Sequence, residues 1–274
     1  MHAWPRLLLV LSIPLALAAG QWGPQGRDEG SLTLAKVVTV MVPAKVAGPE
    51  LEGYRRAAEH GEAAAQTLLG SMYLLGEGLP ADLHAALGWY RKAAEQGNAK
   101  AQTIMGLMCE GGEGMAKDSR EAARWFRLAA EQGDVDGQAR LGQQYYHGEG
   151  LARDLAEARN WLRKAADQGD AESQARLGAM CFMGEGLPRD TPEALKWLRL
   201  ASVQGSAGAQ GCLGMMYALG DGVPRDPVEA YALLLRASAG GNEQAGRTAQ
   251  RVKGGLTAAQ IEEGRVKAGR TLHF

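Results

Sequence analysis

One five-residue word, Ala-Ala-Glu-Gln-Gly or a close variant, recurs along this chain at a constant interval of 36 residues. Its copies begin at Ala57, Ala93, Ala129, Ala165, Ala201 and Ala237. A Gly-acid-Gly triplet keeps the same interval at Gly76, Gly112, Gly148, Gly184 and Gly220, and Trp keeps it at Trp89, Trp125, Trp161 and Trp197. A fixed period in this range is typical of a solenoid, in which each repeat packs only on its neighbours.

Each repeat is predicted to form two helices, as the third one illustrates. Asp134 is a good N-cap for the first helix, and Gly148 ends it because glycine accepts the left-handed C-cap conformation. Asp154 begins the second helix with Glu157 three residues later, a variant of the capping box, and Gly169 ends that helix. The same spacing recurs at Asp118/Glu121, Asp190/Glu193 and Asp226/Glu229. Two helices of about 14 residues fill such a repeat and leave no room for a strand.

The paired glycines of the triplet raise the alternative of a phosphate-binding loop. That fingerprint needs G-x-G-x-x-G after a strand. Here the third glycine is missing in every copy, and the preceding segment is predicted to be helical. The triplet is therefore interpreted as a turn between the two helices of a repeat.

The stretch EAAAQTLLGSMYLLGEGLPAD, from Glu62 to Asp82, resembles the Sel-one-like repeat family, a relative of the tetratricopeptide repeats, through Ala65-Gln66, Leu69-Gly70 and Met72-Tyr73. The resemblance implies an all-α fold, a right-handed superhelical solenoid of two-helix repeats with a 36-residue period. Five full repeats are expected over residues 61–240, between an N-terminal half repeat at 49–60 and a C-terminal half repeat with a capping helix at 241–274. In that capping helix, Thr257 and Gln260 match a capping box.

The first 20 residues are expected to be a secretory signal peptide, with Arg6 before an apolar run and an Ala16-x-Ala18 cleavage word. The run is short for a bilayer span, which takes roughly 20 apolar residues, so an uncleaved anchor is the less favoured alternative. The mature chain, without a transmembrane segment, is expected in the bacterial periplasm or outside the cell. Residues 21–48 are expected to be a mostly extended leader whose run VVTVMV, Val37 to Val42, lies on the first repeat.

Two faces of the first helices differ in how much they vary between repeats. The register of Ala65, Leu69, Met72 and Tyr73 stays mostly small or apolar and is predicted to face the core. The register of Ala64, Leu68, Ser71 and Leu75 changes freely from repeat to repeat. The resemblance implies that this register lines a concave groove. Its expected partner-binding residues are Leu68, Lys100, Ile104, Arg140, Gln143, His147, Arg176, Met183 and Met215.

This register has a polar centre, from Arg140 to Arg176, between apolar ends. Exposed apolar side chains in a line favour an interaction surface. The alternative is that the pairs Asp136/Arg140 and Glu172/Arg176, each four residues apart, only solvate the face, while the leader covers the apolar ends.

The sequence shows no catalytic constellation, metal-ligand set or cofactor motif. The formal net charge of −1 gives no general attraction to nucleic acid. Cys109 and Cys181 occupy core registers and Cys212 a variable one, so burial of the first two and partial burial of the third are expected.

These features favour a non-catalytic scaffold or adaptor that binds a protein or peptide partner. The resemblance also leaves two alternatives open. One is an envelope-acting hydrolase of the cell-wall or β-lactam type, and the other is a role in the endoplasmic-reticulum lumen, for which the chain has no retention signal. Only His147 and Cys212 could serve a hydrolase in the groove, and two repeats would hold them about 20 Å apart.

Overall fold

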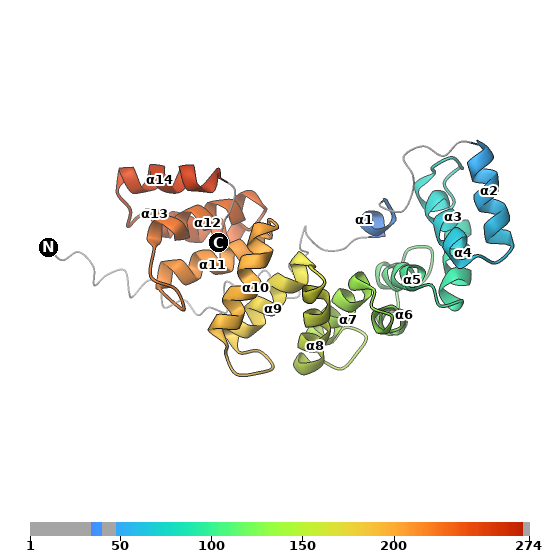
Figure 1. The fold of residues 1–274 in the computed structure, drawn as a ribbon, viewed down its shortest axis with the longest axis horizontal. Helices are drawn as coiled ribbons and strands as arrows, with labels where there is room; N and C mark the ends of the chain where they lie inside the picture. The colour runs from blue at the N-terminus through green and yellow to red at the C-terminus, as the bar shows by residue number, and fades with distance from the viewer. Residues whose placement is uncertain (1–33, 40–47, 271–274) are drawn as a thin grey trace. The chain divides into compact units, whose positions relative to one another are not determined.

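The computed structural model describes residues 34–39 and 48–270, and every secondary-structure element in these ranges is a helix (Figure 1). The signal peptide expected at residues 1–20 lies outside the described residues. The helices are α1 Leu34–Thr39, α2 Gly48–Glu59, α3 Ala63–Leu75, α4 Leu83–Glu95, α5 Ala99–Gly111, α6 Ser119–Glu131, α7 Val135–His147, α8 Leu155–Asp167, α9 Ala171–Met183, α10 Thr191–Val203, α11 Ala207–Leu219, α12 Pro227–Ala239, α13 Glu243–Lys253 and α14 Ala258–Ala268.

The described helices fall into two compact units. The N-terminal unit is the part of residues 32–168 that holds α1 to α8, and the C-terminal unit is the part from Gly169 onward that holds α9 to α14. Within the units, α3 pairs with α4, α5 with α6, α7 with α8, α9 with α10, and α11 with α12. These pairs are the two-helix repeats that the 36-residue period predicts.

Each second helix starts on an aspartate, as expected. In α6 the Asp118 side chain accepts hydrogen bonds from the backbone N–H groups of Arg120 and Glu121. The backbone N–H of Asp118, which a capping box would give to Glu121, instead donates to the carbonyl of Cys109 at 2.9 Å. Every repeat forms this bond, Asp82 to Tyr73, Asp154 to Tyr145, Asp190 to Cys181 and Asp226 to Tyr217. Only half of the expected capping box therefore forms. The aspartate backbone N–H, which the box would use, already donates to a carbonyl of the paired first helix.

The glycine triplets are turns, as predicted. Gly148 ends α7 with a φ of 75°, and its N–H donates to the carbonyl of Gln144. Gly150 also has a positive φ, of 73°, and a Cβ added there would overlap the carbonyl group of Ser119 at the start of α6. Since α6 belongs to the preceding repeat, the second glycine lets the turn of one repeat approach the backbone of another.

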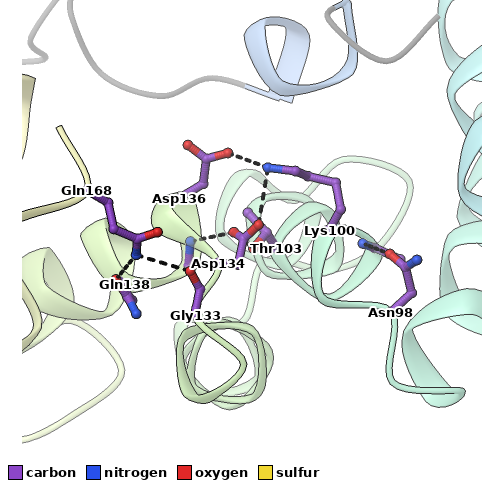
Figure 2. A network of polar contacts seen from close by, with 10 residues as sticks. Asn98, Lys100, Thr103, Gly133, Asp134, Asp136, Gln138 and Gln168 are labelled. Atoms are coloured by element: carbon purple, nitrogen blue, oxygen red, sulfur yellow. Dashed lines mark hydrogen bonds and ion pairs between the residues drawn. The ribbon is translucent and has the colours of Figure 1, made fainter. Parts of the chain in front are cut away.

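A glutamine on the first helix of a repeat, outside the recurring word, accepts a hydrogen bond from the glutamine of the word and so links three helices. Gln102 of α5 donates from its side-chain amide to the carbonyl of Ala94 at 3.1 Å and accepts from Gln132 at 2.7 Å. The same arrangement joins Gln138 to Gln168 at 2.8 Å, as Figure 2 shows. In each case one bond ties the end of a second helix to the first helix of its own repeat, and the other ties that first helix to the preceding second helix. The glutamine of the word makes this bond in the four copies that carry it, as Gln96, Gln132, Gln168 and Gln204.

Most of the core register of the first helices is buried, whereas the tyrosines in that register, Tyr73, Tyr145 and Tyr217, are half-buried. Leu69, Leu141 and Leu177 are at most 1% exposed, and Cys109 and Cys181 are buried as expected. A glycine that recurs every 36 residues in the first helices faces a side chain of the paired helix, at Gly70, Gly106, Gly142, Gly178 and Gly214. At Gly106 a Cβ would lie 2.5 Å from the Phe126 ring. The two helices of each repeat therefore approach closely at these glycines.

The C-terminal helix closes its unit. Thr257 and Gln260 form the predicted capping box at the start of α14. Arg236 of α12 donates to the carbonyls of Lys267 and Ala268, at 2.6 and 2.9 Å, where α14 ends. Gly264 faces the Tyr231 ring, where a Cβ would lie only 2.7 Å away. Together these contacts hold α14 against the last full repeat as a cap.

Candidate functional site

The variable register of α3, α5 and α7, called here the first-helix face, carries most of the expected partner-binding residues. Leu68 is half-buried, and the Lys100 side chain is 36% exposed. Ile104 is fully buried, and so is most of Leu107, one turn further along α5. The first-helix face was predicted to be exposed, but its apolar residues on α5, Ile104 and Leu107, are covered.

The cover is α1, which contacts α5 and α3. Leu34, Val37 and Val38 are buried in the same cluster as Ile104 and Leu107. The leader was expected to be mostly extended because of its β-branched residues, and for residues 34–39 that expectation is wrong. Docking on a helical surface outweighs the weak intrinsic preference, because a helix presents three apolar side chains on one side. The alternative that the leader covers the apolar end of the face holds for these residues.

Lys100 joins two neighbouring repeats in a polar network (Figure 2). Its Nζ lies 2.7 Å from Asp136 Oδ2 and 3.2 Å from Asp134 Oδ2. The other Asp134 oxygen accepts from the Thr103 hydroxyl at 2.8 Å and from the N–H of Gly137 at 2.9 Å. Asp136 therefore pairs with Lys100, and the expected ion pair with Arg140 within α7 is not formed.

Sequence reasoning paired charges four residues apart and overlooked pairs one repeat apart. Positions 36 residues apart occupy the same register of adjacent first helices, and Lys100 and Asp136 have that separation. The missed partners are Asp134, Thr103 and Glu110. A search for opposite charges 36 residues apart, rather than three or four apart, would have found the Lys100/Asp136 pair.

Arg140 is tied to the neighbouring repeat as well. Its Nη1 lies 3.2 Å from Glu110 Oε2, and its side chain is only 12% exposed. Gln144, one turn further along α7, is buried and places its amide 3.5 Å from the other Glu110 oxygen. The centre of the first-helix face thus consists of charges held between α5 and α7.

Gln143 and His147 are half-buried at the end of the same stripe. The His147 ring meets the Tyr146 ring edge-on, with centroids 5.0 Å apart. Both residues lie on α7 with Arg140, so three of the four residues expected at the polar centre share one helix.

The remaining expected residues belong to the C-terminal unit. Arg176 of α9 is buried, while Met183 of α9 and Met215 of α11 are half-buried. Met215 lines a small pocket together with Cys212, Asn242 and Thr248. Burial raises the pKa of Cys212 to about 11, so the thiol stays protonated at neutral pH. This protonation disfavours Cys212 as a nucleophile, and with it the hydrolase alternative.

The ion pairs of Lys100 with Asp134 and Asp136 are expected to make the free energy of unfolding depend on pH. Burial opposes the charge of Lys100, but the hydrogen bond to Asp136 and the charges of Asp134 and Asp136 outweigh it and raise its pKa. A raised pKa stabilises the fold below the ordinary lysine value, about 10.4, and that contribution disappears as the pH rises through the folded value. Lys100→Met is expected to cost about 0.5–1 kcal/mol at pH 7, given solvent screening, and progressively less as the pH rises above the ordinary lysine value.

Urea unfolding of both proteins at pH 7, 9 and 11 measures this difference. Lys117→Met is the control, since Lys117 is an exposed lysine in the turn after α5. Its effect should be small and similar at each pH. A Lys100→Met cost that stays constant to pH 11 would mean that the ion pairs contribute nothing.

Gln144 departs from its register, which holds methionine at Met72, Met108, Met180 and Met216. It is 1% exposed, and its amide reaches Glu110 only at 3.5 Å. Burial of an amide with so weak a partner is unfavourable, so Gln144→Met is expected to stabilise the chain by about 1–2 kcal/mol. Thermal or urea unfolding checks this, with Gln250→Met as an exposed control. A destabilised Gln144→Met protein would show that the amide holds Glu110 and Arg140 in place more strongly than its geometry suggests.

The described residues contain no group of three or more His, Cys, Asp and Glu side chains that could hold a metal ion. Within the same residues, every helix is too short or too polar to span a bilayer.

Comparisons with known proteins agree with this architecture. The family model of the Sel1 repeat matches residues 63–98, 99–134, 135–170, 171–206 and 209–242. Among solved structures, the chain is similar to c5321, a protective antigen present in uropathogenic Escherichia coli strains displaying an SLR fold, with 36% identity and a TM-score of 0.70. That match covers 80% of this chain and 48% of the antigen, so the chain spans about half of that protein.

A Sel1 repeat protein from Oxalobacter formigenes is similar at 29% identity with a TM-score of 0.64, over 80% of this chain and 98% of that one. The comparison with curated proteins gave no match. The repeat boundaries of the family model fall at the starts of α3, α5, α7 and α9, where the 36-residue period places them. The chain therefore belongs to the Sel1 repeat family, the Sel-one-like repeats of the sequence pattern, whose members are generally protein-interaction scaffolds.

Proposed function

We propose that this protein is a non-catalytic scaffold, exported to the periplasm or cell exterior, that binds a protein or peptide partner on its first-helix face. The observation that carries the proposal is the set of half-buried charges on α5 and α7. Lys100 and Arg140 each bind a carboxylate of the adjacent repeat, so their side chains are held in one arrangement before a partner arrives. Polar groups fixed in advance lose less conformational entropy on binding.

The composition of this face suits a protein surface better than a small molecule. It combines Arg140, Gln143 and His147 with apolar residues on the adjoining helices. Arginine is favoured at protein interfaces, where it pairs with carboxylates and stacks on aromatic rings. On the C-terminal unit Met183 and Met215 are half-buried and partly open to a partner, whereas Arg176 is buried. We expect the partner to contribute acidic and apolar side chains.

A capture experiment from bacterial envelope extract tests the proposal. The bait is the tagged chain, compared with a face variant that carries Lys100→Ala, Gln143→Ala and His147→Ala. These three side chains are partly exposed, whereas truncating the more deeply buried Arg140 or Arg176 would disturb packing. A control variant changes three exposed residues elsewhere, Arg91, Lys117 and Arg124, to alanine. Circular dichroism establishes that all variants are folded.

The expected result is a partner that the wild type and the control variant retain and that the face variant loses at least tenfold. Retention by all three would show that recognition lies elsewhere on the chain. Fractionation of cells expressing the whole chain, with the mass of its N-terminus, tests export separately. Cytoplasmic accumulation of an unprocessed chain would contradict that part of the proposal.

A further inference from the structure

A segment of this chain already occupies the apolar part of the first-helix face. Helix α1 buries Leu34, Val37 and Val38, which are 7%, 6% and 0% exposed. Their spacing of three and four residues puts them on one side of the helix. They belong to the same buried cluster as Ile104 and Leu107 of α5. The surface therefore accepts a short helix that presents three apolar side chains.

Helix α1 depends on this contact for its conformation. It has six residues, and isolated helices shorter than about 12 residues are marginal in water. Val37, Val38 and Thr39 are β-branched and disfavour the helical state further. Because the segment is not a stable helix by itself, docking must supply the free energy that forms it. An occupant of this kind can be exchanged for a better one.

The surface beneath α1 differs from the same register in the next repeat. Ile104 and Leu107 correspond to Arg140 and Gln143, so the apolar patch ends where the charged centre begins. Without a cover, two large apolar side chains would meet water side by side, which is uncommon unless a partner binds them. Figure 2 shows Lys100 and Asp136 projecting on the side where the α1 ribbon passes. An apolar centre with a polar rim is the usual anatomy of a protein interface.

We propose that the α3–α5 surface is a binding site for a short apolar helix of the partner, and that α1 occupies it as a competing internal ligand. The inference rests on the proposed function and names the partner's contacting element. The partner helix would present leucine or valine side chains at positions i, i+3 and i+4, as α1 does, in the helix-in-groove mode. Because α1 is tethered, it competes at a high effective concentration and lowers the apparent affinity for any external helix.

Undocking α1 in the full chain tests this inference. Val38→Asp places a charge at a fully buried contact and should release α1 while the repeats stay folded. The probe is a fluorescein-labelled peptide with the sequence of residues 31–43, SLTLAKVVTVMVP. The control peptide carries aspartate at both valine positions of α1. Leu34→Asp repeats the undocking through a different side chain, and circular dichroism checks the helix content of each protein.

The expected result is that the two undocked proteins bind the probe at least tenfold more tightly than the wild type and ignore the control peptide. Adding Leu107→Asp to Val38→Asp should abolish this binding. Equal binding by the wild type and the undocked proteins would overturn the inference, as would no binding by either folded undocked protein.

The same variants separate this inference from the proposed function. A captured partner that the undocked proteins retain more strongly than the wild type supports both. A partner retained equally by the wild type and the undocked proteins, yet lost by the face variant, leaves the proposed function standing and overturns the inference. Probe binding without any captured partner would count against the proposed function alone, since the helix site itself would then be demonstrated.

Discussion

Replacing Gly150 with alanine is expected to destabilise the N-terminal unit by about 2–5 kcal/mol, since a left-handed backbone costs about 1–2 kcal/mol for alanine and overpacking adds about 1–3 kcal/mol. The φ of Gly150 is 73°, and the added Cβ would overlap the carbonyl group of Ser119. A flexible side chain could move aside, but this obstacle is the backbone at the start of α6. The turn of the third repeat would have to lift from the second.

Gly133 provides the matched control. Its φ is 89°, and nothing lies within 4 Å of the position where a Cβ would stand. Gly133→Ala therefore carries the backbone strain without the overlap, and should cost only about 1–2 kcal/mol. Urea unfolding followed by circular dichroism measures both, and hydrogen exchange over residues 112–168 locates the loss. Equal costs for the two variants would show that the contact between the turn and Ser119 contributes nothing to stability.

These two glycines show what the sequence alone predicts and where that prediction stops. Recurrence of Gly-acid-Gly is enough to place a turn, because glycine accepts a positive φ that other residues avoid. It does not say which backbone lies opposite the second glycine. That information depends on how one repeat stacks on the next, which is a tertiary property. The half-formed capping boxes have the same origin, since the carbonyl that takes the Asp118 N–H belongs to another helix.

The first-helix face was predicted in outline and not in detail. The period separates the core register, exemplified by buried Leu69 and Leu141, from the variable one. Within the variable register, local rules favoured an ion pair inside α7, while Asp136 binds Lys100 across the stack. A lysine side chain reaches the adjacent repeat as easily as the next turn of its own helix. The low helix propensity of the β-branched residues likewise favoured an extended leader. Residues 34–39 are nevertheless helical, because the contact of α1 with the repeats outweighs this preference.

Truncation of Leu141 to alanine is the second change with a large expected effect, about 2–5 kcal/mol. Leu141 is fully buried in the core cluster of the N-terminal unit, together with Phe126 and Met105. Removing its isobutyl group leaves a cavity that rigid neighbouring helices fill only in part. Leu128 on α6 is the control, because the same truncation at a side chain 44% exposed should cost under about 0.5 kcal/mol. Urea unfolding compares the two, and equal costs would mean that α7 repacks around the vacancy.

The functional consequence of Leu141→Ala follows from its place on α7. Arg140 precedes it directly, and Gln143 lies two residues further on, so the helix that carries the charged centre is the one whose packing is loosened. In a solenoid each repeat is stabilised mainly by its neighbours, so a weakened α7 also loses its hold on Glu110 and Lys100 of α5. Partner capture should therefore fall for Leu141→Ala and stay unchanged for Leu128→Ala at a temperature where both remain folded. Unchanged capture by a measurably destabilised Leu141→Ala protein would show that recognition does not need the charges of α5 and α7 held in a fixed arrangement.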